Sequence, residues 1–259
     1  MNLERERIKL LEVIQEAGKI VRDGFNVELS ISHKDTINNL VTQIDEASEQ
    51  YIVNALSEAF PEHGFIGEEL GNQQEDAAFK WIIDPIDGTV NFAHRIPLCC
   101  ISIALSYKGT TLLGAVYNPM MNELFYAQKG EGAYLNGKAI KVSQKQDVRK
   151  ALVVTGFPYS APQGDLQPID LFNKVYHSGL PIRRLGAAAL DLCWVACGRF
   201  DAFWEMNLKA WDVAAGYLIV TEAGGRVSNF LNQEASIWEG ETLATNNRVH
   251  EGMLSLLFS

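Results

Sequence analysis

The chain has 259 residues, of which 47% are hydrophobic and 21% are charged. This length and composition are typical of a folded globular protein with a sizeable core, and they exclude a disordered chain. The formal net charge is −10, from 32 acidic and 22 basic residues without a basic cluster, which disfavours nucleic-acid binding. The apolar runs are too short to cross a bilayer and no signal segment is visible, so we expect a cytoplasmic protein outside the membrane.

The N-terminal half is predicted to combine two helices with an antiparallel sheet. Apolar residues recur at helical spacing from Glu4 to Gly24, and a loop is expected from Ser30 to Asn39. Thr42 and Asp45 have the spacing of a capping box, so a second helix is expected to start there and to end near Pro61. Strands and a final hairpin are then predicted at Phe65–Gly67, Trp81–Ile83, Ile101–Tyr107, Thr111–Tyr117, Glu123–Gln128 and Ala133–Val142.

The C-terminal half is predicted to alternate strands and helices. A polar segment around Gln144–Lys150 marks the junction, so we expect one catalytic unit over residues 1–259 with subdomains at 1–146 and 147–259. The second subdomain is expected to contain strand Ala151–Val154, helix Asp165–Ser178, extended segment Arg183–Leu185, helix Ala187–Gly198, strand Phe200–Glu205 and helix Ala210–Ala223.

The cysteines and histidines do not have the spacing of a zinc site. Cys99 and Cys100 are adjacent, and Cys193 and Cys197 lie one helical turn apart, so none forms the CxxC pair of zinc or redox motifs. The five histidines are scattered along the chain. We expect the cysteines to be reduced residues of the core.

The most informative stretch is Trp81–Thr89, which reads WIIDPIDGT. An apolar strand leads into two carboxylates, Pro85 is expected to block continuation of the strand, and the glycine permits a tight turn. Asp84 and Asp87 would then face one cavity, and with the carbonyl of Ile86 they would offer the oxygen ligands that Mg²⁺ prefers. The alternative is an acidic surface turn, because Asp, Pro and Gly are also common turn residues.

Three more acids stand at the ends of predicted elements. Glu68 follows a strand, while Asp45 and Asp212 lie in the first turns of helices. Each has a local alternative: Glu68 with Glu69 as a solvated acidic pair, Asp45 as a helix cap, and Asp212 as a partner of the helix dipole. If all three converge with the two aspartates of WIIDPIDGT, they could not remain ionised together without cations.

Several separated blocks of the sequence occur in the same order in one protein family. They are Leu40–Asp45, Phe65–Glu69, Trp81–Thr89 followed by Asn91 and Phe92, Trp211–Gly216, and Glu222–Gly225. Over essentially its whole length, the chain resembles the inositol monophosphatase family, part of the lithium-sensitive Mg²⁺-dependent phosphatases that include fructose-1,6-bisphosphatases. The resemblance implies an α/β (α+β) fold, a five-layered α-β-α-β-α sandwich.

The resemblance also implies a Mg²⁺ site and its ligands. Glu68, Asp84 and the Ile86 carbonyl would hold a first ion, and Asp84, Asp87 and Asp212 would hold a second. A third, more loosely held ion near Glu68 also occurs in the family. Most of these ligands belong to the subdomain 1–146, and only Asp212 comes from 147–259.

The resemblance assigns catalytic roles as well. Thr89, hydrogen-bonded to Asp45, would orient or deprotonate the attacking water, and Glu68 would assist. Asp87, Gly88 and Thr89 would contact the phosphate ester, the last two through backbone N–H groups at a helix start.

Substrate choice is expected to depend on the second subdomain. Ala188 lies where a helix opens, and Glu205 would accept hydrogen bonds from adjacent hydroxyls, which favours an inositol monophosphate. The alternative for Glu205 is an exposed acid at a strand end. Arg183 or Arg184 would engage a second phosphate of a bisphosphate, or else both are solvated surface charges.

Two positions depart from the family pattern. Ala187 stands where a small hydroxyl residue is usual, which puts a hydroxyl contact with substrate in doubt. Asn39 stands where an aspartate is common, so the loop that carries Lys34 would hold the third ion differently.

The sequence therefore predicts an inositol-1-monophosphatase with two to three Mg²⁺ per subunit. By resemblance it would be lithium-sensitive and homodimeric, and its partner would be a small phosphate ester. Two alternatives stay open: a broad-specificity sugar phosphatase or fructose-1,6-bisphosphatase, and a non-catalytic regulatory protein on the same scaffold.

Overall fold

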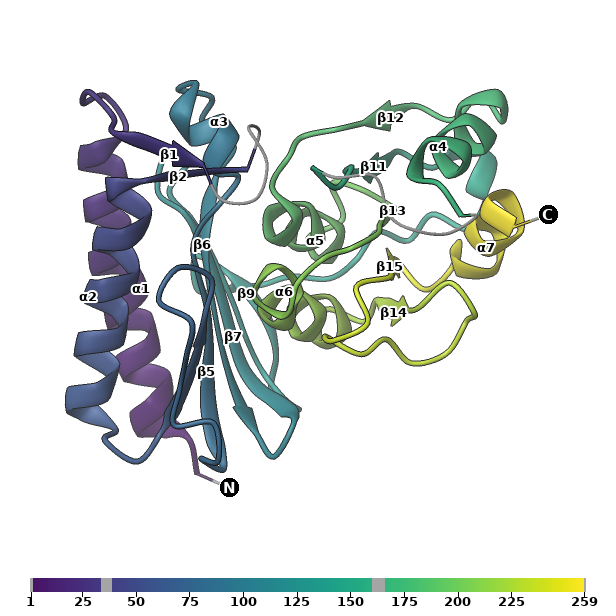
Figure 1. Ribbon diagram of the computed structural model, residues 1–259. Coiled ribbons are helices and arrows are strands. Elements are labelled where there is room, and N and C mark those ends of the chain that lie inside the picture. Colours follow the sequence, from purple (N-terminus) through teal and green to yellow (C-terminus); the bar gives the residue numbers. More distant parts are fainter. Residues whose placement is uncertain (1, 34–38, 160–165, 259) are drawn as a thin grey trace.

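The elements of the protein form five layers, helix, sheet, helix, sheet and helix (Figure 1). The computed structural model describes residues 2–33, 39–159 and 166–258. The layers agree with the predicted α/β sandwich, which is confirmed. The helices of the three helical layers are α1 (Glu4–Gly24) and α2 (Gln43–Ala59), then α5 (Ala188–Ala196) and α6 (Ala210–Glu222), and finally α4 (Pro168–His177) and α7 (His250–Phe258).

The large sheet has the strand order β10-β9-β8-β7-β6-β5-β3-β4. Its strands pair antiparallel, as expected, except that β3 and β5 run parallel. Parallel strands end at the same edge of a sheet, so the residues that follow β3 and those at the end of β5 lie side by side. The strands are β3 (Gly64–Gly67), β4 (Asn72–Gln73), β5 (Phe79–Asp87), β6 (Cys100–Tyr107), β7 (Thr110–Asn118), β8 (Glu123–Gln128), β9 (Gly132–Leu135) and β10 (Lys138–Ala139).

Two predictions for the N-terminal half need correction. The expected loop from Ser30 to Asn39 contains strand β1 (Ile31–His33), which pairs with β2 (Leu40–Thr42). Pro85 interrupts strand β5 without ending it, because pairing with β6 resumes at Asp87 after a register shift. Proline lacks an N–H to donate, so the ladder bulges around it.

The smaller sheet has the strand order β12-β11-β13-β15-β14 and is mixed, with β11 parallel to β12 and β13. The predicted alternation of strands and helices is found as far as α6, within one to three residues at most element ends. Sequence patterns missed β14, β15 and α7. Asp165, the expected start of α4, lies outside the described residues. The strands are β11 (Val153–Thr155), β12 (Ile182–Arg183), β13 (Ala202–Glu205), β14 (Arg226–Ser228) and β15 (Thr242–Thr245), and a short 3-10 helix, η1 (Val148–Lys150), precedes them.

Apolar side chains pack on both faces of the large sheet. Ile83 of β5 belongs to a buried cluster with Leu10 of α1 and Ile52 of α2, whereas its neighbour Ile82 belongs to a cluster with Ile219 of α6. A strand covered on both faces is apolar at consecutive positions, which explains the apolar run before the first aspartate of WIIDPIDGT. Within the described ranges, no helix is both long and apolar enough to cross a bilayer.

Candidate active site

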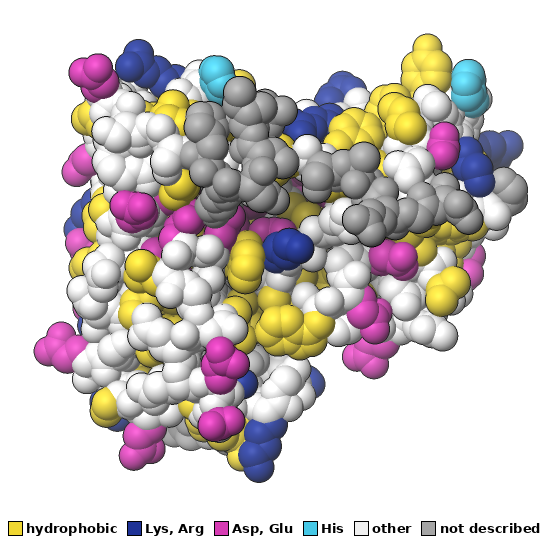
Figure 2. Space-filling model, viewed as in Figure 1, with side chains coloured by type: hydrophobic (Ala, Val, Ile, Leu, Met, Phe, Trp, Pro, Cys, Tyr) yellow, Lys and Arg dark blue, Asp and Glu magenta, His cyan; other side chains and the backbone are white. Residues whose placement is uncertain are grey.

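A cavity of about 360 Å³ lies where the ends of β3 and β5 meet the first turns of α5 and α6. Figure 2 shows Asp and Glu side chains gathered at the hollow between the two halves of the molecule. All predicted metal-ligating residues line this cavity, namely Glu68, Asp84, Ile86, Asp87 and Asp212. The predicted substrate residues Gly88, Thr89, Ala188 and Glu205 line it as well. The structure therefore brings together residues as far apart in the chain as Glu68 and Asp212.

The acids of β3 and β5 reach the cavity through the parallel pairing and the bulge. The N–H of Glu68 donates to the carbonyl of Ile83 at 3.3 Å, which carries the strand pairing to the edge of the cavity. Within the bulge, the N–H of Ile86 donates to Oδ1 of Asp84 at 3.0 Å. The unpaired residues of the bulge thus turn the backbone so that Asp84 and Asp87 both face the cavity.

Asp87 joins the two halves of the molecule. Its Oδ2 accepts a hydrogen bond from the N–H of Ala189 at 2.7 Å, and its carboxylate also accepts one from the N–H of Ala188. These are N–H groups of the first turn of α5, which have no partner inside the helix. A carboxylate at a helix N-terminus is stabilised by the helix dipole, so Asp87 both caps α5 and lines the cavity.

Asp212 and Asp45 likewise combine a local role with a place at the site. Oδ2 of Asp212 accepts from the N–H of Lys209 at 2.7 Å, at the start of α6, while the side chain lines the cavity. Oδ2 of Asp45 accepts from the N–H of Thr42 at 2.9 Å in a capping box, and its Oδ1 accepts from the hydroxyl of Thr89 at 3.1 Å. The local alternatives are therefore also correct for these two residues.

A hydrogen bond across the halves places Asp212 opposite Asp84. Ser102 pairs with Asp84 in the β5–β6 ladder, and its hydroxyl donates to the carbonyl of Trp211 at 3.1 Å. The first turn of α6 is thereby tied to the strand that carries Asp84. This contact explains how two separate sequence motifs meet at one cavity.

Gly88 connects the bulge to the short helix α3 (Thr89–Ala93). Its φ is +88°, and a Cβ there would lie 2.9 Å from the carbonyl oxygen of Leu98 and 3.1 Å from that of Gly186. A side chain would be excluded both by conformation and by space. Asn91 of α3 donates to the carbonyl of Leu185 at 2.7 Å, which holds the start of α5 beside this turn.

The carboxylates of the cavity repel one another. Burial raises the pKa of Asp84 well above its usual value, and the charges of Glu68, Asp87 and Asp212 raise it further, as does a hydrogen bond with Glu68. Burial also raises the pKa of Asp212 well above its usual value, again with the charge of Glu68. The pKa of Asp45 is raised to about 6, mainly by burial, although its hydrogen bonds with Thr42 and Thr89 oppose the rise.

These residues fit a hard divalent cation such as Mg²⁺. The set contains four carboxylates and one backbone carbonyl, and all its donor atoms are oxygens. In the part of the chain that the structure describes, no three or more His, Cys, Asp and Glu side chains are arranged closely enough to hold a metal ion as they stand. The fit to a cation therefore rests on the chemistry of the donor set and on the mutual repulsion of its carboxylates, which a bound cation would relieve.

Glu205 stands at another wall of the cavity, at the end of β13. It packs closely on Gly156, where a Cβ would lie 2.1 Å from its Oε2. Burial, and then the charge of Asp87, raises the pKa of Glu205 to about 8, while Arg184 opposes the rise. The cavity thus has a group of acids near the bulge and a further acid, Glu205, at the end of β13.

Comparison with known proteins identifies the chain as a whole. The profile of the inositol monophosphatase family matches residues 3–258. The chain belongs to the inositol monophosphatase family.

Its relatives in this family carry two kinds of name. The chain is 39% identical to the inositol-1-monophosphatase of Caulobacter vibrioides over 254 residues, 96% of this chain and 99% of that protein. It is 40% identical to the Nus factor SuhB of Escherichia coli (strain K12) over 244 residues, 93% of this chain and 91% of that protein. The solved structure of inositol monophosphatase from Anabaena (Nostoc) sp. PCC 7120 matches with a TM-score of 0.89 and 35% identity, covering 99% of this chain and 96% of that one.

The two departures from the inositol monophosphatase pattern both lie at the cavity. Ala187 and Asn39 are among its lining residues, and Lys34 lies outside the described residues. Ala187 is the N-cap of α5 and has no side chain to cap it. Asp87 supplies acceptors for the first N–H groups of the helix, so the missing hydroxyl does not leave these groups unpaired.

The prediction for Arg183 needs correction. Arg183 does not line the cavity, and its guanidinium donates to the carbonyl of Ile182 on the surface. Arg184 lines the cavity in its place. Successive side chains of an extended segment point to opposite sides, so only one of the two arginines can face the site.

Sequence reasoning also missed two residues at or near the site. Lys209 lines the cavity beside Asp212, and it could have been found as the residue that begins the same helix as the WD motif. Asp191 of α5 is buried, and in the described structure neither of its carboxylate oxygens has a hydrogen-bond partner. It lies one helical turn beyond Ala188, a position that its apolar surroundings in the sequence do not distinguish.

Proposed function

We propose that the protein is a Mg²⁺-dependent phosphomonoesterase that hydrolyses inositol monophosphates to inositol and phosphate. The observation that carries this proposal is that Glu68, Asp84, Asp87 and Asp212 line one cavity together with Glu205. The carboxylate set suits cations that bind phosphate, and the additional carboxyl group of Glu205 suits a polyol. Membership of a phosphatase-type family supports the same reaction class.

The residues that would hold the cations are the four carboxylates and the carbonyl of Ile86, with Asp84 shared between two ions. When bound, two to three Mg²⁺ would lower the pKa of a water molecule and neutralise charge on the phosphate and the leaving oxygen. The buried position of Asp84, which is 1% exposed, keeps water from competing for its oxygens.

Thr89 and Asp45 would handle the proton of the attacking water. The oxygen of the Thr89 hydroxyl lies 3.1 Å from Oδ1 of Asp45 and 2.9 Å from the carbonyl oxygen of Ile86, and its one hydrogen can point to either. When it points to Asp45, the oxygen can accept a proton from water as its own proton passes to Asp45. A pKa near 6 leaves Asp45 mostly ionised at neutral pH and still basic enough to accept that proton. Backbone N–H groups at Gly88 and Thr89 would hold phosphate oxygens at the first turn of α3.

Glu205 would select the alcohol that leaves. The pKa of about 8 for Glu205 applies to the metal-free cavity, and the positive charge of bound cations would favour the ionised form. As a carboxylate, Glu205 can accept hydrogen bonds from two neighbouring hydroxyls of inositol, and its burial against Gly156 fixes its position. Arg184 and Lys209, which also line the cavity, would instead favour a second phosphate on the substrate. The first preference gives an inositol monophosphatase, and the second gives a fructose-1,6-bisphosphatase or a broad sugar phosphatase.

A substrate panel at saturating Mg²⁺ tests the proposal. Inositol 1-phosphate should be turned over with a higher kcat/KM than fructose 1,6-bisphosphate or 3′-phosphoadenosine 5′-phosphate, and Glu205→Gln should lose most of this preference while Arg183→Gln retains it. Lithium should inhibit the wild-type protein. If all three esters are turned over equally, the enzyme has broad specificity and the proposed preference for inositol is wrong. If none of them is turned over, the proposal that the protein is an enzyme is wrong.

A regulatory role is a second candidate, because the chain is 39–42% identical to proteins named Nus factor SuhB. The two roles are separable in cells that lack the gene for this protein. An Asp84→Asn variant should fail to restore wild-type growth if hydrolysis is the function. Full restoration by this variant, with phosphate release abolished, would show that the protein acts without catalysis.

A further inference from the structure

Helix α2 carries three buried polar residues on the face that packs against the large sheet. Asp45, Ser48 and Glu49 are each 0% exposed, and their spacing places them on one side of the helix. The same face continues with apolar residues, including Ile52. Burial of polar groups costs free energy unless each is hydrogen-bonded. The hydrogen-bond partners of these three residues therefore indicate their role.

Ser48 contacts the bulge of β5. Its hydroxyl donates to the carbonyl of Pro85 at 3.3 Å. That carbonyl lies between Asp84 and Ile86, in the stretch where pairing with β6 shifts register. The hydroxyl therefore holds a part of the backbone that the sheet leaves unpaired.

Glu49 contacts the segment that follows β3. Its Oε2 accepts from the N–H of Glu69 at 2.8 Å, and its Oε1 accepts from the N–H of Leu70 at 3.3 Å. On the other side of Glu68, a Cβ at Gly67 would lie 1.7 Å from Oε1 of Glu49. The carboxylate thus packs against the residue before Glu68 and binds the two residues after it.

Glu69 and Leu70 are not cavity residues, and neither Ser48 nor Glu49 lines the cavity. Both side chains act on backbone beside predicted metal-binding positions, and both come from one rigid helix. A hydrogen bond to an ionised carboxylate is stronger than one between neutral groups, so the 2.8 Å contact from the N–H of Glu69 to Glu49 holds this backbone most firmly.

We propose that Ser48 and Glu49 are positioning residues that set the distance between Glu68 and the Asp84–Ile86 bulge, and thereby the affinity of the site for its first divalent cation. The inference rests on the proposed metal-dependent function. It identifies two residues of α2 that would determine the affinity for the metal. Residues that orient metal ligands in this way change affinity or activity by roughly 10- to 100-fold when they are replaced.

The test measures metal binding directly, by electron paramagnetic resonance titration of Mn²⁺ into the metal-free full-length protein. Glu49→Gln keeps the shape of the side chain but places an NH2 group where one carboxylate oxygen accepts, so one of the two N–H groups faces a donor and loses its acceptor. We expect its Mn²⁺ dissociation constant to rise at least ~10-fold. Glu46→Gln on the exposed side of the same helix is the matched control and should bind as the wild type does.

Two further measurements separate positioning from simple loss of stability. The Mg²⁺ concentration for half-maximal phosphate release should rise with the Mn²⁺ dissociation constant, while kcat at saturating Mg²⁺ recovers to within a few-fold of wild type. In a Glu68→Gln background, Glu49→Gln should weaken Mn²⁺ binding much less, because the ligand that it positions is gone.

Two variants test the same inference from other residues. Gly67→Ala should weaken Mn²⁺ binding as Glu49→Gln does, because its methyl group displaces the carboxylate, and Ser48→Ala should weaken it to a smaller extent. Unchanged Mn²⁺ affinity in Glu49→Gln, or in Ser48→Ala if Glu49→Gln does not fold, would overturn the inference. A wild-type protein that binds no Mn²⁺ would instead overturn the proposed function.

Discussion

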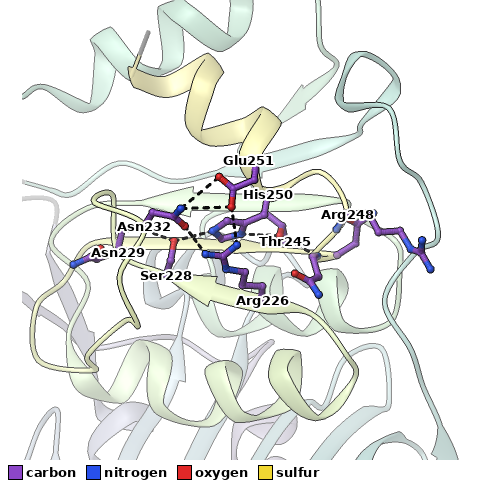
Figure 3. A network of polar contacts seen from close by, with 10 residues as sticks. Arg226, Ser228, Asn229, Asn232, Thr245, Arg248, His250 and Glu251 are labelled. Carbon is purple, nitrogen blue, oxygen red and sulfur yellow. Dashed lines mark hydrogen bonds and ion pairs between the residues drawn. The ribbon is translucent and has the colours of Figure 1, made fainter.

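Two regions of this protein bury several polar side chains, and they do so in opposite ways. At the cavity, buried carboxylates raise one another's pKa. Around α7, His250 is 0% exposed and both its ring nitrogens are paired, Nε2 with the hydroxyl of Ser228 and Nδ1 with that of Thr245, each at 2.9 Å (Figure 3). The carboxylates at the cavity repel one another, whereas each ring nitrogen of His250 has a hydrogen-bond partner.

This difference in pairing distinguishes the cavity, which is suited to bind a ligand, from the His250 network, which stabilises the fold. Buried polar groups that pair with each other stabilise one conformation, whereas buried groups of like charge destabilise it until a partner of opposite charge binds. The network around His250 links β14, β15 and α7, and Arg226 extends it by contacts with Glu251 and Asn232 (Figure 3). Substitutions should therefore affect activity in one region and stability in the other.

The largest expected effect is that of Asp84→Asn. Phosphate release should fall by roughly 10³-fold or more, because the variant removes a charged ligand of the cations that would neutralise charge on the reacting phosphate. The metal-free variant should nevertheless be at least as stable as the wild type, since one of the repelling charges is gone. Phosphate release and thermal unfolding in a chelator measure the two quantities. Near-normal turnover, or a marked loss of stability without metal, would contradict the view that the cavity serves activity and the His250 network serves stability.

Acid should destabilise the fold through His250. Burial, and then the charge of Arg226, lowers the pKa of His250 from 6.5 to about 4 in the folded chain. Between these values the unfolded chain binds more protons than the folded chain, so stability rises with pH. The contribution is complete above about pH 6.5, falls as the pH drops, and is lost below about pH 4, a total of about 3 kcal/mol.

Urea unfolding at a series of pH values measures this dependence. His250→Gln has no group that titrates there, so its stability should be lower at neutral pH and should change less between pH 6.5 and 4. An equally steep dependence in this variant would assign the effect to other groups.

Divalent cations should stabilise the wild-type fold. Binding to the folded state alone adds about 2.7 kcal/mol at a free concentration one hundred times the dissociation constant. The rise in unfolding temperature with Mg²⁺ should be small in Asp84→Asn and unchanged in His250→Gln, because only the first variant changes the cavity. An equal rise in Asp84→Asn would place the stabilising ion elsewhere.

The sequence predicted which residues line the cavity better than it predicted the hydrogen bonds that hold those residues in place. Asp84 and Asp87 were found because a strand, a proline and a glycine leave a local pattern. The capping role of Asp87 toward α5 was not predicted, because its partners Ala188 and Ala189 are about one hundred positions away and have no polar side chains to mark them. Long-range hydrogen bonds to backbone N–H groups have no sequence signature.

The fold shows the same limit. Helices α1 and α2 were predicted within a residue or two from periodicity and the Thr42 cap, whereas β14 and β15 were missed. These two strands have three and four residues, too few for an alternating pattern to be distinct. They are stabilised by the pairing of β15 with β13 and β14 and by the polar network of His250, which are tertiary features.

The smallest effect is expected at the exposed margin of the His250 network. Arg226 and Glu251 form an ion pair at 2.8 Å, but their side chains are 36% and 70% exposed. Water screens such a pair and the two side chains lose rotamer freedom, so Glu251→Gln should lower the free energy of unfolding only slightly. Thr245→Val, which removes a buried hydroxyl from His250, should cost more, about 1–3 kcal/mol. Urea unfolding of both variants at neutral pH measures the two losses of stability. A larger loss in Glu251→Gln than in Thr245→Val would mean that the exposed charges, and not the paired buried groups, hold α7 against the sheet.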